Sequence, residues 1–94
     1  MTNATLGVLQ EVLRERQRQE AKWGEQNLPP AIWLMVLGEE VGEANNAALE
    51  HLLGNLGDLS HYREELIQVA AVAIHAVESF DRQLARQDGL EARP

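Results

Sequence analysis

Residues 66–77 limit the possible folds more than any other part of the sequence. They read Leu-Ile-Gln-Val-Ala-Ala-Val-Ala-Ile-His-Ala-Val, in which only Gln68 and His75 are polar. A helix that is apolar on nearly all sides has to be buried on nearly all sides, and two other helices of the same chain would leave part of it exposed. The run therefore predicts self-association, in which the second and third helices of two chains form a four-helix bundle.

Helical segments separated by two breaks account for most of the chain. Apolar residues at helical spacing predict three helices, over about residues 5–22, 30–53 and 58–86. The third begins at Asp58 or Ser60. The apolar stripes of the first two helices are Leu6, Leu9, Val12 and Leu13, and Trp33, Leu37, Val41, Ala44, Ala48 and Leu52. We expect an all-α fold and a single domain over residues 1–94, with a frayed tail from 87 to 94.

Glycine and capping residues mark the helix ends. Asn3 or Thr5 is expected to cap the first helix, and Gly24 suits the left-handed position after its end. Gly38 and Gly42 lie four residues apart inside the second helix, where each glycine costs about 1 kcal/mol relative to alanine. Close approach of another backbone or of a ligand would explain that cost.

Composition excludes several classes of function. The 94 residues include no cysteine and carry a net charge of −7, from 15 acidic and 8 basic residues. The absence of cysteine excludes disulfides and thiolate metal sites, and the negative charge argues against a nucleic-acid partner. No apolar run approaches the roughly 20 residues that span a bilayer, and residues 1–5 lack signal-peptide features. We expect a soluble cytoplasmic protein without a membrane partner.

Acidic residues occur in closely spaced pairs on the second and third helices. Glu40 and Glu43 are three residues apart and share one helix face, and Glu39 adds a third acid beside them. Glu65 and Gln68 have the same spacing on the third helix. Glu43 and Glu65 lie at comparable distances from the break between the two helices, so antiparallel packing across that break would bring the pairs together.

The position of these acids at the edge of an apolar face makes them candidates for a metal site. Clustered carboxylates near a core repel one another and resist desolvation unless a cation neutralises them. Oxygen ligands without cysteine favour Mg²⁺ or Mn²⁺ over Zn²⁺. The alternative is a set of solvated surface glutamates with ordinary salt bridges, and the residues alone leave the two interpretations evenly balanced.

The two acidic segments follow one another in a specific order. Glu39-Glu40-Val41-Gly42-Glu43 is followed, after 21 residues counted from Glu43, by Glu65-Leu66-Ile67-Gln68. This order resembles that of the MazG-like, all-α nucleoside triphosphate pyrophosphohydrolases, whose motif halves are Glu-Glu-x-x-Glu and Glu-x-x-Asp. The segments 15–19, 22–24 and 62–71 also look like those of phage-type and small bacterial members. The resemblance covers about residues 11–80.

The resemblance implies Mg²⁺-dependent cleavage of a nucleoside triphosphate to the monophosphate and pyrophosphate. Glu40, Glu43 and Glu65 would be metal ligands; Glu39, catalytic together with Glu40, would be an additional ligand or would orient the attacking water. Phosphoryl transfer depends on charge neutralisation and in-line positioning, which metals held by carboxylates provide. Gln68 stands where the family has aspartate. Its neutral amide oxygen is a metal ligand without charge, which implies weaker metal binding, one metal ion fewer or loss of activity.

Three further residues are candidates for substrate binding. Trp23 would stack on a base and Lys22 would contact phosphate; the simpler alternative, which we favour, has Trp23 packed against the bundle and Lys22 solvated. Arg63 would meet a triphosphate, or would pair with Asp58 or a neighbouring acid. His75 is expected to be a hydrogen-bonded core or interface residue.

Three functional hypotheses follow from these features. The leading one is a house-cleaning nucleotide pyrophosphohydrolase that uses Mg²⁺ and forms a homo-dimer or tetramer. The second is a catalytically reduced relative that serves as a nucleotide-binding, metal-binding or regulatory module. The third is a purely structural helical dimer.

Overall fold

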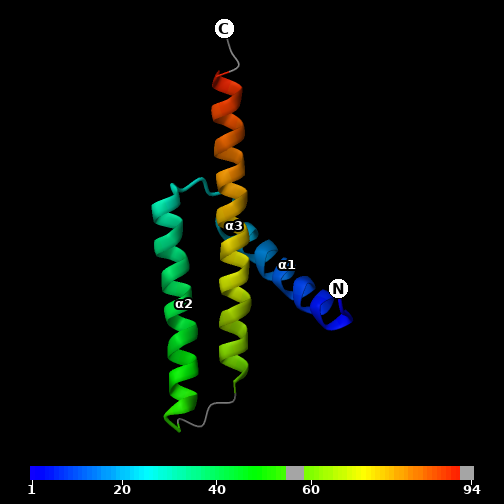
Figure 1. Cartoon of the computed structure of the whole chain (residues 1–94), viewed down its shortest axis with the longest axis vertical. Helices are drawn as coiled ribbons and strands as arrows, with labels where there is room; N and C mark the ends of the chain where they lie inside the picture. The colour runs from blue at the N-terminus through cyan, green and yellow to red at the C-terminus, as the bar shows by residue number, and fades with distance from the viewer. Residues whose placement is uncertain (55–58, 92–94) are drawn as a thin grey trace.

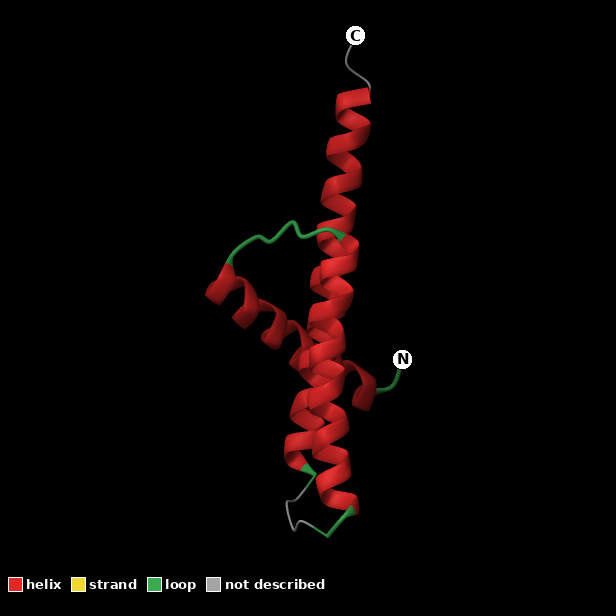
Figure 2. Ribbon diagram, turned by 90° about the vertical axis from the view of Figure 1, so that its left-hand side faces the viewer, coloured by secondary structure: helices red, strands yellow, loops and turns green. Residues whose placement is uncertain are grey.

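The chain forms three helices, in a computed structural model that describes residues 1–54 and 59–91, without the side chains of 88–91. They are α1 (Asn3–Trp23), α2 (Pro30–Leu52) and α3 (Ser60–Glu91). Helices α2 and α3 lie side by side and antiparallel, and α1 crosses α3 at a steep angle (Figures 1 and 2). The described residues contain no strand, which confirms the predicted all-α class. None of the described helices is long and apolar enough to cross a bilayer.

The start of α1 differs from the prediction by its capping residue. Thr2 is the N-cap, and its side-chain oxygen accepts a hydrogen bond from the Thr5 N–H at 3.0 Å. Asn3 already belongs to the first turn and the Thr5 N–H acts as a donor, so neither of these two predicted residues is the N-cap. At the other end, the expected role of Gly24 is confirmed: its φ is 71° and its N–H donates to the Glu20 carbonyl at 2.8 Å.

The other helix ends lie close to the predicted positions, except at the C-terminus. Helix α2 begins at Pro30, where no N–H is needed, and ends one residue earlier than expected, before Gly54 with a φ of 82°. Helix α3 begins at Ser60; Asp58 and residues 92–94 lie outside the described residues. It continues to Glu91, beyond the expected end near Arg86.

Burial is concentrated where α3 meets the other two helices. The buried apolar residues are Val12, Trp33, Ala44, Ala47, Ala71 and Val72. Of the four members of the apolar stripe of α1, the steep crossing buries only Val12 and leaves Leu6, Leu9 and Leu13 exposed within the single chain. In α2, Val41 and Leu52 are likewise exposed within the single chain.

The buried ring contact between α2 and α3 is made by Trp33 and His75. Their ring centroids are 4.6 Å apart with an interplanar angle of 52°, and both side chains are almost completely buried. The expected core position of His75 is therefore confirmed, but its buried Nε2 has no hydrogen-bond partner among the described residues. Burial and the positive charge of Arg16 lower the pKa of His75, which keeps the imidazole neutral.

The second half of α1, which looks polar in sequence, is held against α3 by a buried arginine. Arg16 is 8% exposed; its Nε lies 2.6 Å from Glu78 and its Nη2 2.8 Å from Glu20. Gln19, one turn further, is also buried. A buried guanidinium needs such partners, so this contact stabilises the crossing of α1 and α3.

The connection between α1 and α2 is bound along α3 by polar side chains. Arg82 donates to the Asn27 side chain and to the Gln26 carbonyl, both at 3.0 Å. Gln83 donates to the carbonyls of Asn27 and Leu28 at 2.9 and 3.1 Å. These bonds satisfy backbone groups that have no helical partner and help to fix where α2 begins.

Much of the apolar surface of α2 and α3 is uncovered within one chain. The exposed members on α3 are Leu66, Ile74, Val77, Phe80 and Leu84, and on α2 they include Leu34, Met35, Leu49 and Leu52. An apolar cleft of about 310 Å³ lies between Trp33 and Leu34 on one side and Val77 and Phe80 on the other. The expectation that two helices of the same chain leave part of α3 exposed is confirmed.

The expected close approach at Gly38 and Gly42 is not found among the described residues. No neighbouring side chain or remote backbone atom lies within 4 Å of where a Cβ would stand at either position. Packing within a single chain therefore gives no reason for these glycines.

Candidate metal centre and the adjoining arginine cleft

The contact between Trp33 and His75 sets the register in which the acidic residues meet. Glu43 lies ten residues after Trp33, and Glu65 lies ten residues before His75. In an antiparallel helix pair, equal steps from a contact lead to residues at the same level along the bundle. Glu43 and Glu65 are thus level with one another, as the sequence predicted.

Carboxylates from the two helices converge at this level. Glu40, Glu43 and Glu65 each offer a carboxylate oxygen, and these oxygens lie within 4.8 Å of one another. Glu65 is buried with 6% of its surface exposed, Glu40 is half-buried and Glu43 is exposed. The predicted cluster therefore forms, and it reaches from the edge of the core to the surface.

Two oxygens of the cluster are buried without a partner. The Oε2 atoms of Glu40 and Glu65 have no hydrogen-bond partner among the described residues. The other oxygen of Glu65 lies 3.6 Å from His61 Nε2, one turn earlier on α3. Buried carboxylate oxygens that lack donors are costly in a folded protein, and a bound cation would satisfy them.

Electrostatics in the cluster favours protonation when no cation is present. Burial raises the pKa of Glu65, a hydrogen bond with Glu43 raises it further, and the charges of Glu43 and Glu40 act in the same direction. Burial, followed by the charges of Glu43, Glu15 and Glu39, raises the pKa of Glu40. Both carboxylates are thus destabilised as anions, which is the condition that a cation relieves.

Glu39 and Gln68, the other predicted members of the site, differ in their exposure and in their position relative to the cluster. Glu39 is exposed and is not one of the three converging residues, although its charge acts on Glu40. Gln68 is half-buried, one turn after Glu65. It lies seven residues before His75, as Glu40 lies seven after Trp33, and the register therefore places Gln68 level with Glu40. Three acidic residues with oxygen ligands alone fit a hard cation such as Mg²⁺ or Mn²⁺.

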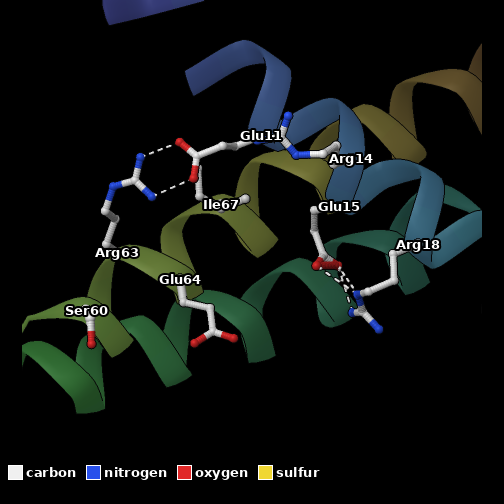
Figure 3. A pocket seen from close by; sticks show the side chains of 8 residues that line it. All are labelled: Glu11, Arg14, Glu15, Arg18, Ser60, Arg63, Glu64 and Ile67. Atoms are coloured by element: carbon white, nitrogen blue, oxygen red, sulfur yellow. Dashed lines mark hydrogen bonds and ion pairs between the residues drawn. The ribbon is translucent and has the colours of Figure 1, made fainter. Parts of the chain in front are cut away.

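A cleft of about 380 Å³ opens beside the cluster, between α1 and the start of α3 (Figure 3). It is lined by Glu11, Arg14, Glu15, Arg18, Ser60, Arg63, Glu64 and Ile67. Arg63 pairs with Glu11 across the cleft, and Arg18 pairs with Glu15 on α1. Of the two roles expected for Arg63, pairing with a neighbouring acid is the one observed, and that acid is Glu11.

Lys22 and Trp23 are neither among the three converging carboxylates nor among the residues that line the cleft, although Lys22 follows the cleft residue Arg18 by one turn of α1. Trp23 is 52% exposed, so the expectation that it packs against the bundle is wrong for the single chain. Lys22 is exposed, as the simpler alternative expected, and its Nζ lies 4.6 Å from the centroid of the Trp23 ring, a cation–π contact.

Sequence reasoning missed the residues that α1 brings to this region. The available signal was a spacing of three and four residues, which places four charged side chains on one helix face: Glu11, Arg14, Glu15 and Arg18. The crossing of α1 over α3, which decides what that face meets, has no local signature. His61 was missed as well, although it stands one turn before Glu65.

Comparison with known proteins adds no relative. No family model matches the chain, and neither do the curated proteins or the solved structures.

The raised pKa values predict how metal binding depends on pH. Both groups have folded-state pKa values above the ordinary glutamate value, so protons compete with the cation. The affinity for Mg²⁺ should fall as the pH is lowered from about 8 to 5, by up to about tenfold per pH unit for each proton displaced. Calorimetric titration with Mg²⁺ at several pH values measures this, and an affinity independent of pH would contradict the prediction.

The same raised pKa values affect the folding stability of the metal-free protein, which should be higher at low pH, whereas metal binding should be weaker there. A folded pKa above the unfolded one contributes stability at low pH that is lost as the pH rises through the folded value. Glu40→Gln should therefore reduce the gain in melting temperature between pH 8 and pH 5 without metal.

Proposed function

We propose that this chain is a Mg²⁺-dependent nucleoside triphosphate pyrophosphohydrolase with a house-cleaning role in the nucleotide pool. In this reaction a water oxygen bonds to the α-phosphorus, and the bond from that phosphorus to the α–β bridging oxygen breaks. The monophosphate and pyrophosphate are released. The observation that carries the proposal is the convergence of Glu40, Glu43 and Glu65 from two helices, with two buried carboxylate oxygens that lack partners.

The residues present are suited to hold the metal and the water. Glu40, Glu43 and Glu65 would bind Mg²⁺ or Mn²⁺, and the amide oxygen of Gln68 is an additional candidate ligand. Such an ion neutralises phosphate charge and lowers the pKa of a bound water when it is present. Glu40 and the exposed Glu39 would orient the attacking water. Because covalent catalysis is not needed for phosphoryl transfer, the absence of cysteine from the chain is no obstacle.

A nucleotide- or metal-binding module without turnover is the second candidate, and Gln68 favours it. This residue lies level with Glu40 but carries no charge. The cluster would then bind a cation with three carboxylates and hold a nucleotide without the full charge that catalysis requires. In both cases the exposed Trp23 ring would stack on the base, and Lys22 beside it would contact phosphate.

We also propose that two copies of the chain pair through α2 and α3 to form a four-helix bundle, as a dimer or as half of a tetramer. The support is the exposed apolar surface on both helices, including Leu34, Met35, Val77 and Phe80. A monomer rarely leaves a continuous apolar surface of this kind in water. A second copy would also lie over Gly38 and Gly42, where a single chain leaves open space.

The enzymatic proposal is tested by pyrophosphate release across a panel of canonical and damaged nucleoside triphosphates with Mg²⁺ or Mn²⁺. At least one nucleotide should be turned over. Glu40→Gln and Glu43→Gln should each lower kcat/KM by about 100-fold or more, because a displaced metal removes several kcal/mol of transition-state stabilisation. Glu50→Gln, on the exposed surface of α2, is the matched control and should have no effect.

The two candidates separate in the same assay. Absence of turnover for every nucleotide, combined with thermal stabilisation by Mg²⁺ that Glu40→Gln abolishes, would contradict the enzyme and favour the binding module.

The neutral residue at position 68 gives a further prediction. Gln68→Asp should tighten Mg²⁺ binding by about tenfold or more, because one added charge about 4 Å from a cation contributes on the order of 1–4 kcal/mol. Gln68→Asn is the matched control, since it shortens the side chain equally without adding charge. Calorimetry that shows no tighter binding for the aspartate variant than for the asparagine variant would count against the site.

Self-association is measured by sedimentation at low protein concentration. The chain should sediment as a dimer or tetramer, and Val77→Glu together with Phe80→Glu should shift it toward the monomer, because both residues are about half exposed in one chain. Leu6→Glu, exposed on α1, should leave the assembly unchanged. A stable folded monomer in the unmodified protein would contradict the bundle.

A further inference from the structure

The cleft between α1 and α3 gathers arginines in an acidic protein, with three glutamates, Glu11, Glu15 and Glu64, lining it beside them. The chain has a net charge of −7 and only 8 basic residues, yet Arg14, Arg18 and Arg63 all line this one cleft. Two of them come from α1 and one from α3, so the cleft exists only because these helices cross. An accumulation of arginine at this position indicates an anionic ligand.

The Arg63 side chain is engaged in a way that resembles phosphate binding. Its Nη1 and Nη2 donate to the two carboxylate oxygens of Glu11, at 2.9 and 2.5 Å (Figure 3). This two-pronged geometry is the one in which guanidinium binds phosphate. Glu11 thus occupies the donors that a phosphate would use.

Arg18 is engaged in the same manner on the other side of the cleft. Its Nε lies 2.9 and 3.0 Å from the two oxygens of Glu15, and its Nη2 lies 2.7 Å from one of them. Arg18 and Arg63 are each more than half exposed, at 54% and 56% of the side chain. Exposed ion pairs contribute little to stability, so exchange of their carboxylates for a more highly charged anion is inexpensive.

The cleft adjoins the carboxylate cluster. Glu64, which lines the cleft, precedes Glu65 of the cluster in sequence. Glu15 and Arg18 both lie close enough to Glu40 for their charges to act on it, in opposite directions. A ligand with one end at the metal centre can therefore extend its other end toward the arginines.

We propose that this cleft receives the β- and γ-phosphates of the substrate and retains the pyrophosphate product, with phosphate oxygens replacing Glu11 on Arg63 and Glu15 on Arg18. The proposal rests on the proposed function, since it assigns the polyphosphate end of that substrate. It places the α-phosphate at Glu40, Glu43 and Glu65. It also resolves how an acidic chain accepts a polyanion, because the arginines supply positive charge in addition to the metal.

The test measures the affinity of the 94-residue chain for inorganic pyrophosphate by calorimetry, with Mg²⁺ at one fixed concentration. Arg63→Ala and Arg18→Ala should each weaken binding by about tenfold or more. Glu11→Gln should strengthen it several-fold, because the competing carboxylate loses its charge while its shape is kept. Arg86→Ala is the matched control: Arg86 is 60% exposed on α3 and pairs with Glu25 away from the cleft.

The outcomes distinguish this proposal from the proposed function. If pyrophosphate affinity is the same in Arg63→Ala, Arg18→Ala and Arg86→Ala while nucleotides are still hydrolysed, the cleft assignment is overturned and the function stands. If no nucleotide is hydrolysed but pyrophosphate binding still requires Arg63 and Arg18, the enzyme reading is overturned and the anion cleft stands. A melting curve for each variant confirms folding, and Arg63→Lys, which keeps the charge but not the paired donors, should bind more weakly than the unmodified chain.

Discussion

The packing of α3 against both other helices is the contact on which the rest of the structure depends. Its long apolar run supplies the surface for α2 on one side and α1 on another. The Trp33–His75 contact sets the register of α2 against α3, and the buried Arg16, bound to Glu78, holds the crossing of α1. Both candidate sites follow from these two contacts: the first brings the carboxylates together, and the second opens the arginine cleft.

The carboxylate cluster stands in a place that packing alone would not favour. Burial and mutual repulsion raise the pKa of Glu40 and Glu65, and each residue keeps one buried oxygen without a donor among the described residues. Apolar residues at these positions would avoid that cost. Local conflicts of this kind are typical of functional sites, and a divalent cation bound by the three converging carboxylates would remove the conflict.

Features that depend on residues close together in the sequence could be predicted, whereas features that depend on residues far apart in the sequence could not. Helices, the glycine end of α1 and the meeting of Glu43 with Glu65 follow from local spacing and from counting across one short break, and they were predicted. The angle between α1 and α3 is set by side chains far apart in sequence, such as Arg16 and Glu78. Hence the exposure of Leu9 and Leu13 was missed, and so was the contribution of α1 to the arginine cleft, of which only Arg63 was a predicted candidate.

We propose above all that Glu40, Glu43 and Glu65 hold a divalent metal ion. The most direct test is anomalous diffraction from crystals of the protein grown with Mn²⁺, which has the same preference for oxygen ligands as Mg²⁺. An anomalous peak is expected within roughly 2.0–2.3 Å of a carboxylate oxygen of each of the three residues. A well-ordered cluster without such a peak at saturating Mn²⁺, or a peak bound elsewhere on the chain, would contradict it.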